Sequence, residues 1–244
     1  MDGGAWLAVA GMRVDWIYRD LDRVAAVWAD CQAGRADCHA QVGHPHGFWS
    51  PAYVGELALG RILADPDGEL AAVRDGLHYP LMLRDALRTR SLWEAGFCLE
   101  IAVKPAARGD VAYVAGCVYR AVGCLVQAVH ADASRWVTNE KGGVRAAAAL
   151  PGAPPAFEAR VAALLGALGR TPDELARSLA AAAELLAGAT DILSAADKAS
   201  TADTASAADT ASAAAGVGGG GAGGGGAAQK GGQGTAGQSP EGSG

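Results

Sequence analysis

The sequence predicts an α+β protein in which a small sheet is followed by a mainly helical bundle and a disordered tail. Short apolar and aromatic segments between glycine turns occupy the first third of the chain. From Pro80 onward, apolar residues recur at helical spacing over long stretches. From about Ala195 the chain becomes Ala/Ser/Thr/Asp repeats and glycine runs, which bury too little to offset the entropy of folding. We therefore expect a sheet-bearing domain over 1–78, a helical bundle over 79–194 and a disordered low-complexity tail over 195–244.

The chain begins with a predicted β-hairpin. Its strands are expected at about Ala5–Val9 and Met12–Arg19, joined by an Ala10-Gly11 turn. Strand alternation places the aromatic residues of the second strand on one face and Asp15 on the other. Because aspartate is depleted in strands, Asp15 requires an explanation.

The rest of the first domain is predicted from caps and turns. Asp20 is expected to cap a helix over Leu21–Gln32. The segment 43–47 is expected to be a loop by composition. The remaining expected elements are a strand within Arg35–Val42, a short helix over Pro51–Leu59, a short strand over Gly60–Ala64 and a turn over Asp65–Gly68.

The bundle should contain two long helices followed by shorter ones. The first runs over Leu81–Val103 and should be stopped by Pro105. The second runs over about Val111–Ala131, with Asp110 as its N-cap. Further helices are expected over Gly142–Leu150, over Pro155–Leu168, and from Thr171 to about Ala189, beyond which the chain is disordered or continues as a frayed helix.

The helical patterns also predict packing. Trp93 and Phe97 recur every four residues and are expected in the core. Gly116 and Gly123 lie two turns apart, which would allow another helix to approach closely. A buried cation needs a partner, so Arg120 is expected to pair with Glu94 or Glu100, with a phosphate as the alternative partner.

Composition limits the class of protein. The net charge of −6 at pH 7, without clustered Lys or Arg, gives no reason to expect nucleic-acid binding. The five cysteines are odd in number, which indicates reduced thiols in a cytoplasmic protein. No signal peptide and no run of eighteen apolar residues is found, so no membrane association is expected.

Five motifs occur in an order that resembles one enzyme family. They are Arg13-Val-Asp-Trp-Ile-Tyr-Arg-Asp-Leu21, Gly43-His-Pro-His-Gly-Phe48 (the His-Pro-His motif), Asp65-Pro-Asp-Gly68, Arg108-Gly-Asp-Val-Ala-Tyr113 and Asn139-Glu-Lys-Gly142 (the Asn-Glu-Lys motif). Together they resemble bacterial members of the DNA polymerase β-like nucleotidyltransferase superfamily. That superfamily includes aminoglycoside nucleotidyltransferases and the minimal nucleotidyltransferases of toxin–antitoxin pairs.

The resemblance implies a mixed nucleotidyltransferase sheet, of which this chain would hold a remnant, followed by the helical bundle. In the family a Gly-Ser and an Asp-x-Asp precede a third carboxylate, and Asp15 matches that third position. Two Mg²⁺ ions held by such carboxylates stabilise the attacking and leaving oxygens of nucleotidyl transfer. The only acidic residue before Asp15 is Asp2, and no Gly-Ser precedes it. We therefore expect an N-terminally truncated member, through real truncation or a late start codon, with impaired catalysis.

The resemblance also suggests further site residues. Glu140 would act as a substrate ligand or general base, and Lys141 would face the triphosphate. Both are equally consistent with a charged helix cap. Arg19 and His46 are expected to contact nucleotide, although His46 is also consistent with simple loop structure, and the His and Cys spacing matches no standard zinc site.

Two functions follow as hypotheses. In the first, the protein transfers a nucleoside monophosphate from an NTP to a hydroxyl of a small molecule or a protein. In the second, it is a non-catalytic interaction protein whose helical module binds a partner, as antitoxins do. An unpaired sheet edge would also favour a protein partner or a homodimer. The coding sequence upstream of Met1 would discriminate between the two functions.

Overall fold

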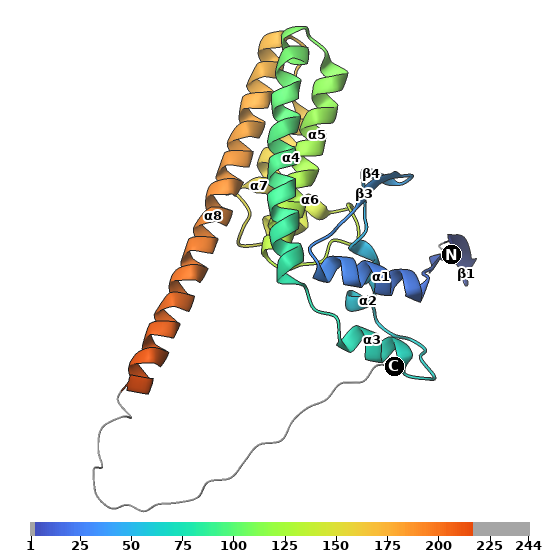
Figure 1. Ribbon diagram of the computed structural model, residues 1–244. Coiled ribbons are helices and arrows are strands. Elements are labelled where there is room, and N and C mark those ends of the chain that lie inside the picture. The colour runs from blue at the N-terminus through green and yellow to red at the C-terminus, as the bar shows by residue number, and fades with distance from the viewer. Residues whose placement is uncertain (1–2, 217–244) are drawn as a thin grey trace, which may run out of the picture. The chain divides into compact units, whose positions relative to one another are not determined.

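The computed structural model describes residues 3–216, and the side chains of residues 3–196 (Figure 1). The chain divides into two units, residues 1–199 and 200–244. The first unit contains two small antiparallel sheets and a helical bundle, which confirms the α+β class. Because neither sheet contains a parallel pair, the mixed sheet implied by the resemblance is not seen in the described part of the chain.

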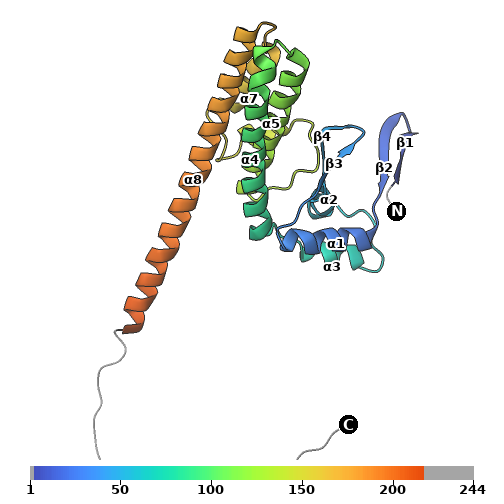
Figure 2. The ribbon, with the colours of Figure 1, turned by 45° about the horizontal axis from the view of Figure 1, so that its top comes forward.

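The first hairpin forms as predicted. Strand β1 (Gly3–Val9) pairs antiparallel with β2 (Met12–Tyr18). The turn residues Ala10 and Gly11 have φ of 49° and 80°, the left-handed geometry of a two-residue turn that matches the strand twist. Figure 2 shows this hairpin as a ribbon separate from the second hairpin.

The second hairpin corrects two predictions. Strand β3 (Cys38–Gln41) lies within the predicted range, but β4 (His44–Trp49) covers most of the segment expected to be a loop. Gly43, with φ of 86°, makes the turn, so the glycines that indicated a loop here belong to a hairpin. The strand expected over 60–64 does not form, because this segment has no strand partner.

Three helices complete the N-terminal region. Helix α1 (Leu21–Gln32) has the predicted bounds, and the Asp20 side chain accepts from the main-chain nitrogens of Asp22 and Arg23. Helix α2 (Ala52–Leu59) follows the second hairpin. Helix α3 (Glu69–Asp75) comes directly after the predicted Asp65–Gly68 turn, which the Gly68 N–H closes on the Asp65 carbonyl.

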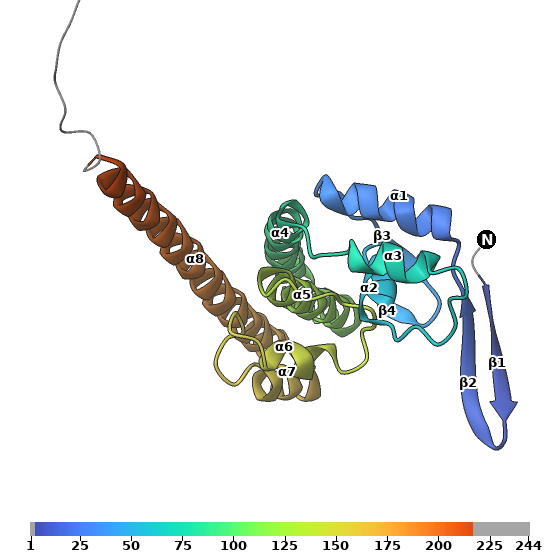
Figure 3. The same ribbon diagram turned by 90° about the horizontal axis from the view of Figure 1, so that it is seen from below.

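The bundle is built on α4 (Leu81–Ala107) and α5 (Val111–Asp132), which lie side by side (Figures 1 and 3). Contrary to expectation, Pro105 does not stop α4, and the helix continues to Ala107. Ala102 and Ala106 are buried on either side of the proline, and this packing offsets the hydrogen bond that proline cannot donate.

Helices α6 (Gly143–Ala148), α7 (Phe157–Gly166) and α8 (Pro172–Gly216) follow. Helix α8 passes the predicted end at Ala189 and continues through the Ala/Ser/Thr/Asp repeats. This corresponds to the expected alternative of a helical extension through the alanine-rich repeats, since alanine is the strongest helix former. The glycine-rich end of the tail, residues 217–244, lies outside the described residues.

Buried side chains form two clusters. The larger joins α4, α5, α7 and α8. The smaller joins α1, β4 and α2 to the start of α4 through Leu83 and Leu87. Trp93 and Phe97 belong to neither: they are 67% and 46% exposed and stack on each other at 5.3 Å between ring centroids. Their predicted core position is wrong, because α4 turns its small side chains, Ala95 and Ala102, toward α5 instead.

Among the described residues, two helices are long and apolar enough to cross a membrane by length and composition, Val111–Asp132 and Pro172–Ala196. Neither helix is an unbroken run of eighteen apolar residues, and the expectation of no membrane span stays a prediction. Within the apolar window of α5, 56% of the residues are buried inside the protein, as expected of a core helix, whereas the corresponding share in the second segment is 28%.

Candidate functional site

Two motifs of the sequence meet at one place in the structure. The main-chain N–H of His46, in the His-Pro-His motif, donates to both carboxylate oxygens of Glu140, at 3.0 and 3.1 Å. The Nδ1 atom of His44 lies 3.9 Å from the same carboxylate. Glu140 belongs to the Asn-Glu-Lys motif, 94 positions further along the chain. We call this contact and its immediate surroundings the His46–Glu140 site.

The imidazole of His46 lies flat against α5. It stacks on the ring of Tyr119 at 3.9 Å, with 6° between the ring planes. A Cβ atom at Gly123 would be 2.1 Å from Nδ1 of His46, so only glycine fits at this position. Gly123 therefore admits a histidine and not another helix, and Gly116 faces open space, which corrects the predicted close approach of a helix.

Arg120 ties the site to α4. Its Nε donates to Glu94 at 2.6 Å, which confirms the first of the two predicted partners. Its Nη1 donates to the main-chain carbonyl of His46, and its Nη2 lies 3.8 Å from Sγ of Cys38. Burial lowers the pKa of Arg120, but the hydrogen bond to Glu94 and the other interactions of the guanidinium outweigh this and raise it, so the group is a permanent cation.

The environment of His46 favours its neutral form. Burial is the largest cause of a lowered pKa, the charge of Arg120 adds to it, and the carboxylate of Glu140 opposes it. Nδ1 of His46 is buried and has no hydrogen-bond partner among the described residues. The pKa of Tyr119 is raised, first by burial and then by Glu140. At neutral pH the site thus holds a neutral imidazole near the Glu140 carboxyl group and the permanent cation of Arg120.

A cleft of about 610 Å³ lies beside the site. The second hairpin supplies most of its lining, and Arg120 contributes from α5. This volume suits a small-molecule ligand. A second cavity of about 30 Å³ lies between His46, Gln127 and Glu140, and its volume corresponds to about one water molecule.

The structure places the other predicted site residues elsewhere. Asp15 is exposed on β2, opposite Trp6, and no contact joins it to His46 or Glu140 within the described chain. Arg19 donates to Glu56 through Nε at 2.6 Å and through Nη2 at 2.8 Å.

Lys141 has an exposed side chain, and its main-chain N–H bonds to Oδ1 of Asn139 at 2.9 Å. Of the five predicted site residues, the structure brings together His46 and Glu140. Among the residues described, no group of three or more His, Cys, Asp or Glu side chains is placed to hold a metal ion. The role of Asp15 as a magnesium ligand remains a prediction.

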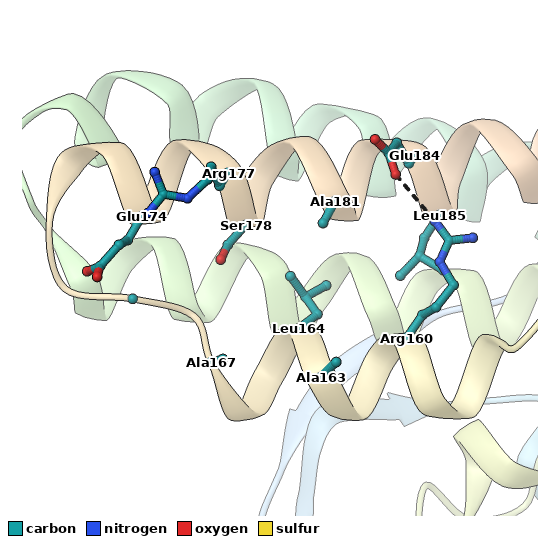
Figure 4. A pocket seen from close by; sticks show the side chains of 11 residues that line it. Arg160, Ala163, Leu164, Ala167, Glu174, Arg177, Ser178, Ala181, Glu184 and Leu185 are labelled. Atoms are coloured by element: carbon teal, nitrogen blue, oxygen red, sulfur yellow. Dashed lines mark ion pairs between the residues drawn. The ribbon is translucent and has the colours of Figure 1, made fainter.

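A second cleft, also of about 610 Å³, lies between α7 and α8 (Figure 4). Its polar groups serve the fold. Arg160 pairs with Glu184 at 3.7 Å across the two helices. Glu174 accepts from the main-chain nitrogens of Arg170 and Thr171, as the predicted capping box requires, and Ser178 donates to the Leu168 carbonyl. Each of these polar groups therefore has a partner within the fold.

No protein-family model matches the chain, and no curated protein or solved structure matches it either.

Proposed function

We propose that the protein is a nucleotidyltransferase-family protein that binds an NTP with Mg²⁺ and passes a nucleoside monophosphate to a hydroxyl of a small molecule or a protein. The observation that supports this proposal is the contact between His46 and Glu140. It joins two of the motifs that carry the resemblance, and it borders a cleft large enough for a nucleotide.

Three charged side chains have distinct tasks in this proposal: Arg120 lines the cleft, whereas Glu140 and Lys141 lie outside its lining, next to His46 through the Glu140 contact. Arg120 supplies a permanent positive charge, although its guanidinium is engaged with Glu94, so it attracts phosphate at longer range. Lys141 is exposed on the segment that carries Glu140 and is free to reach a triphosphate. Glu140 orients the acceptor hydroxyl or removes its proton.

Asp15 is a magnesium ligand in this proposal only together with further carboxylates. Mg²⁺ demands several oxygen ligands in an octahedral arrangement, and one exposed side chain does not provide them. Nucleotide binding and catalysis can therefore be tested separately, and binding can be measured directly on this chain.

The test is equilibrium binding of Mg²⁺–ATP, and of the other three NTPs, to the full chain by calorimetry. We expect binding at millimolar nucleotide or below, and Lys141→Ala should weaken it by about tenfold, the loss of one charge-assisted contact. Lys104→Ala removes an equally exposed lysine near the end of α4 and should have no effect. If no NTP binds, or if both variants bind like the parent chain, the proposal is wrong.

A second candidate function is a non-catalytic protein that binds a partner through its helices. It is favoured by the exposed Trp93–Phe97 stack on α4, because large aromatic side chains exposed together are typical of interaction surfaces. An apolar groove of about 600 Å³ also lies between α4 and α8. Absence of nucleotide binding in the experiment above would favour this candidate.

A further inference from the structure

The first hairpin has one face that is apolar from end to end. Cross-strand partners share a face, so the observed register separates the side chains of β1 and β2 into two sets. One set contains Arg13 and Asp15 together with Trp6, Ala8 and Ile17. The other is Ala5, Leu7, Val9, Met12, Val14, Trp16 and Tyr18. Met12, Trp16 and Tyr18 are each more than half exposed.

Such a hairpin needs more than its own two strands. A two-stranded hairpin is marginally stable in water, and three or more strands with an apolar face are needed for independent stability. Within the described chain no third strand pairs with β1 or β2 (Figure 3). The outer edge of β2 therefore presents unpaired main-chain groups.

The register shows which main-chain groups face that edge. The turn closes on the Val9–Met12 pair, which is hydrogen-bonded in a two-residue hairpin, and such pairs alternate along the ladder with pairs that are not. The N–H and C=O groups of Arg13 and Asp15 consequently point away from β1. The same holds for Ile17, the partner of Gly4. A strand added to this edge therefore pairs with Arg13, Asp15 and Ile17, and the first two side chains carry opposite charges on the same face.

We propose that the hairpin joins a second copy of this chain, β2 against β2 in antiparallel orientation, with a two-fold axis at Val14. In this register Arg13 lies opposite Asp15 of the second copy, and Asp15 lies opposite its Arg13. Both pairs are of opposite charge, which stabilises directly facing residues. The result is a four-stranded sheet formed by two identical hairpins.

The neighbouring registers fail on charge. Moving the axis to residue 15 places Asp15 opposite Asp15, and moving it to residue 13 places Arg13 opposite Arg13. Like charges directly opposite are destabilising. On the apolar face, the proposed register sets Met12 opposite Trp16 of the second copy, a favourable contact between sulfur and an aromatic ring. The same register therefore pairs opposite charges on one face and apolar side chains on the other.

This inference does not depend on the proposed nucleotide site, which lies on other elements. It uses the Asp15 carboxylate in an ion pair, and the proposed function uses it as a metal ligand only where further carboxylates are present.

The test is sedimentation velocity of the full chain across the micromolar range. We expect a monomer–dimer equilibrium. The single variants Arg13→Asp and Asp15→Arg each convert both facing pairs to like charges and should raise the dissociation constant by about tenfold or more. When the two variants are mixed, residue 13 of each chain faces a residue 15 of opposite charge in the other chain. The mixture should therefore form a heterodimer about as stable as the parent's homodimer. The double variant R13D/D15R should also dimerise.

Asp67→Arg is the matched control for Asp15→Arg. It makes the same change of charge at an exposed turn away from the hairpin, and it should leave the dimer unchanged. A parent chain that stays monomeric throughout would overturn the proposal. So would single variants that dimerise like the parent, or a mixture that associates no better than its components.

Cross-linking provides a second measurement that does not rely on charge. Val14 faces its own copy as a non-hydrogen-bonded pair, with Cα atoms about 4.5 Å apart, within the range that a disulfide spans. Val14→Cys should give a disulfide-linked dimer on mild oxidation. Ala8→Cys, on β1, and the parent chain with its five cysteines should not. Equal cross-linking of all three would also contradict the proposed register.

Discussion

At the scale of single residues, the position of His46 is fixed by groups from three parts of the chain. Its ring lies on Tyr119, its N–H is held by Glu140, and its carbonyl accepts from Arg120. Gly123 makes this arrangement possible by leaving the surface of α5 bare. Because the imidazole of His46 fills the space at Gly123, a methyl group added at Gly123 would displace the ring. It would thereby change both the stability of the protein and the geometry of the site.

We expect Gly123→Ala to lower the free energy of unfolding by about 1–3 kcal/mol, since the new methyl group would displace the His46 ring. Gly116→Ala, in the same helix but facing open space, should instead raise it by about 0.5–1 kcal/mol, because alanine is the better helix former. Urea unfolding followed by circular dichroism measures both values. Equal effects of the two substitutions would show that the His46 ring does not lie against Gly123.

Two histidines, the buried His130 and the half-buried His46, make stability depend on pH. Burial lowers the pKa of His46 and of His130 below the ordinary value of 6.5. The unfolded chain therefore binds protons that the folded chain does not, so stability is complete above about pH 6.5 and falls as the pH drops through and below that value. Urea unfolding at a series of pH values should show this decline. His130→Gln should make the decline shallower, and an unchanged slope would exclude His130 as a contributor.

At the scale of elements, helix boundaries follow from capping side chains. Asp20 caps α1 and Asp110 caps α5, as the sequence predicts. Pro105 lies inside α4, where burial of its neighbours maintains the helix. Local chemistry therefore determines where these helices begin, whereas packing has a decisive influence on where α4 ends.

Removal of the α5 cap should be measurable. Oδ1 of Asp110 accepts from the main-chain N–H of Tyr113 at 3.1 Å. Asp110→Ala should lower the free energy of unfolding by about 1 kcal/mol, the usual effect of losing an N-cap. Asp67→Ala, at an exposed turn position, is the control for loss of a negative charge. A cost no larger than that of the control would mean that α5 does not need this cap.

At the scale of the whole molecule, the candidate site belongs to no single element. The second hairpin, α4, α5 and the segment before α6 each contribute one or more groups to it. Separation of the site from the first hairpin means that nucleotide binding and self-association can be tested by different variants. The exposed Trp93–Phe97 stack belongs neither to the candidate site nor to the first hairpin, and it is a third surface that could bind a partner.

Much of the fold could be predicted because its signals are local. The left-handed turn at Ala10-Gly11, the Asp20 and Asp110 caps and the apolar stripe of α5 each depend on residues within a few positions of one another. The candidate site could be predicted only in part. The motifs indicate His46 and Glu140 as separate candidates but give no signal for Tyr119, and Gly123 stands out in the sequence only as a small residue in a helix.

The sequence by itself determined the α+β class and the bounds of the elements with strong local signals, such as the first hairpin and α1, because backbone hydrogen bonds and side-chain periodicity act over short stretches of chain. It did not predict β4 or α3. Only the tertiary structure decided that His46 meets Glu140 across 94 positions, that Gly123 receives an imidazole, and that Trp93 faces solvent. Those outcomes depend on which helix faces pack together, and several faces of comparable apolarity compete for the same core. Sequence patterns within one helix do not indicate which of its faces packs into the core.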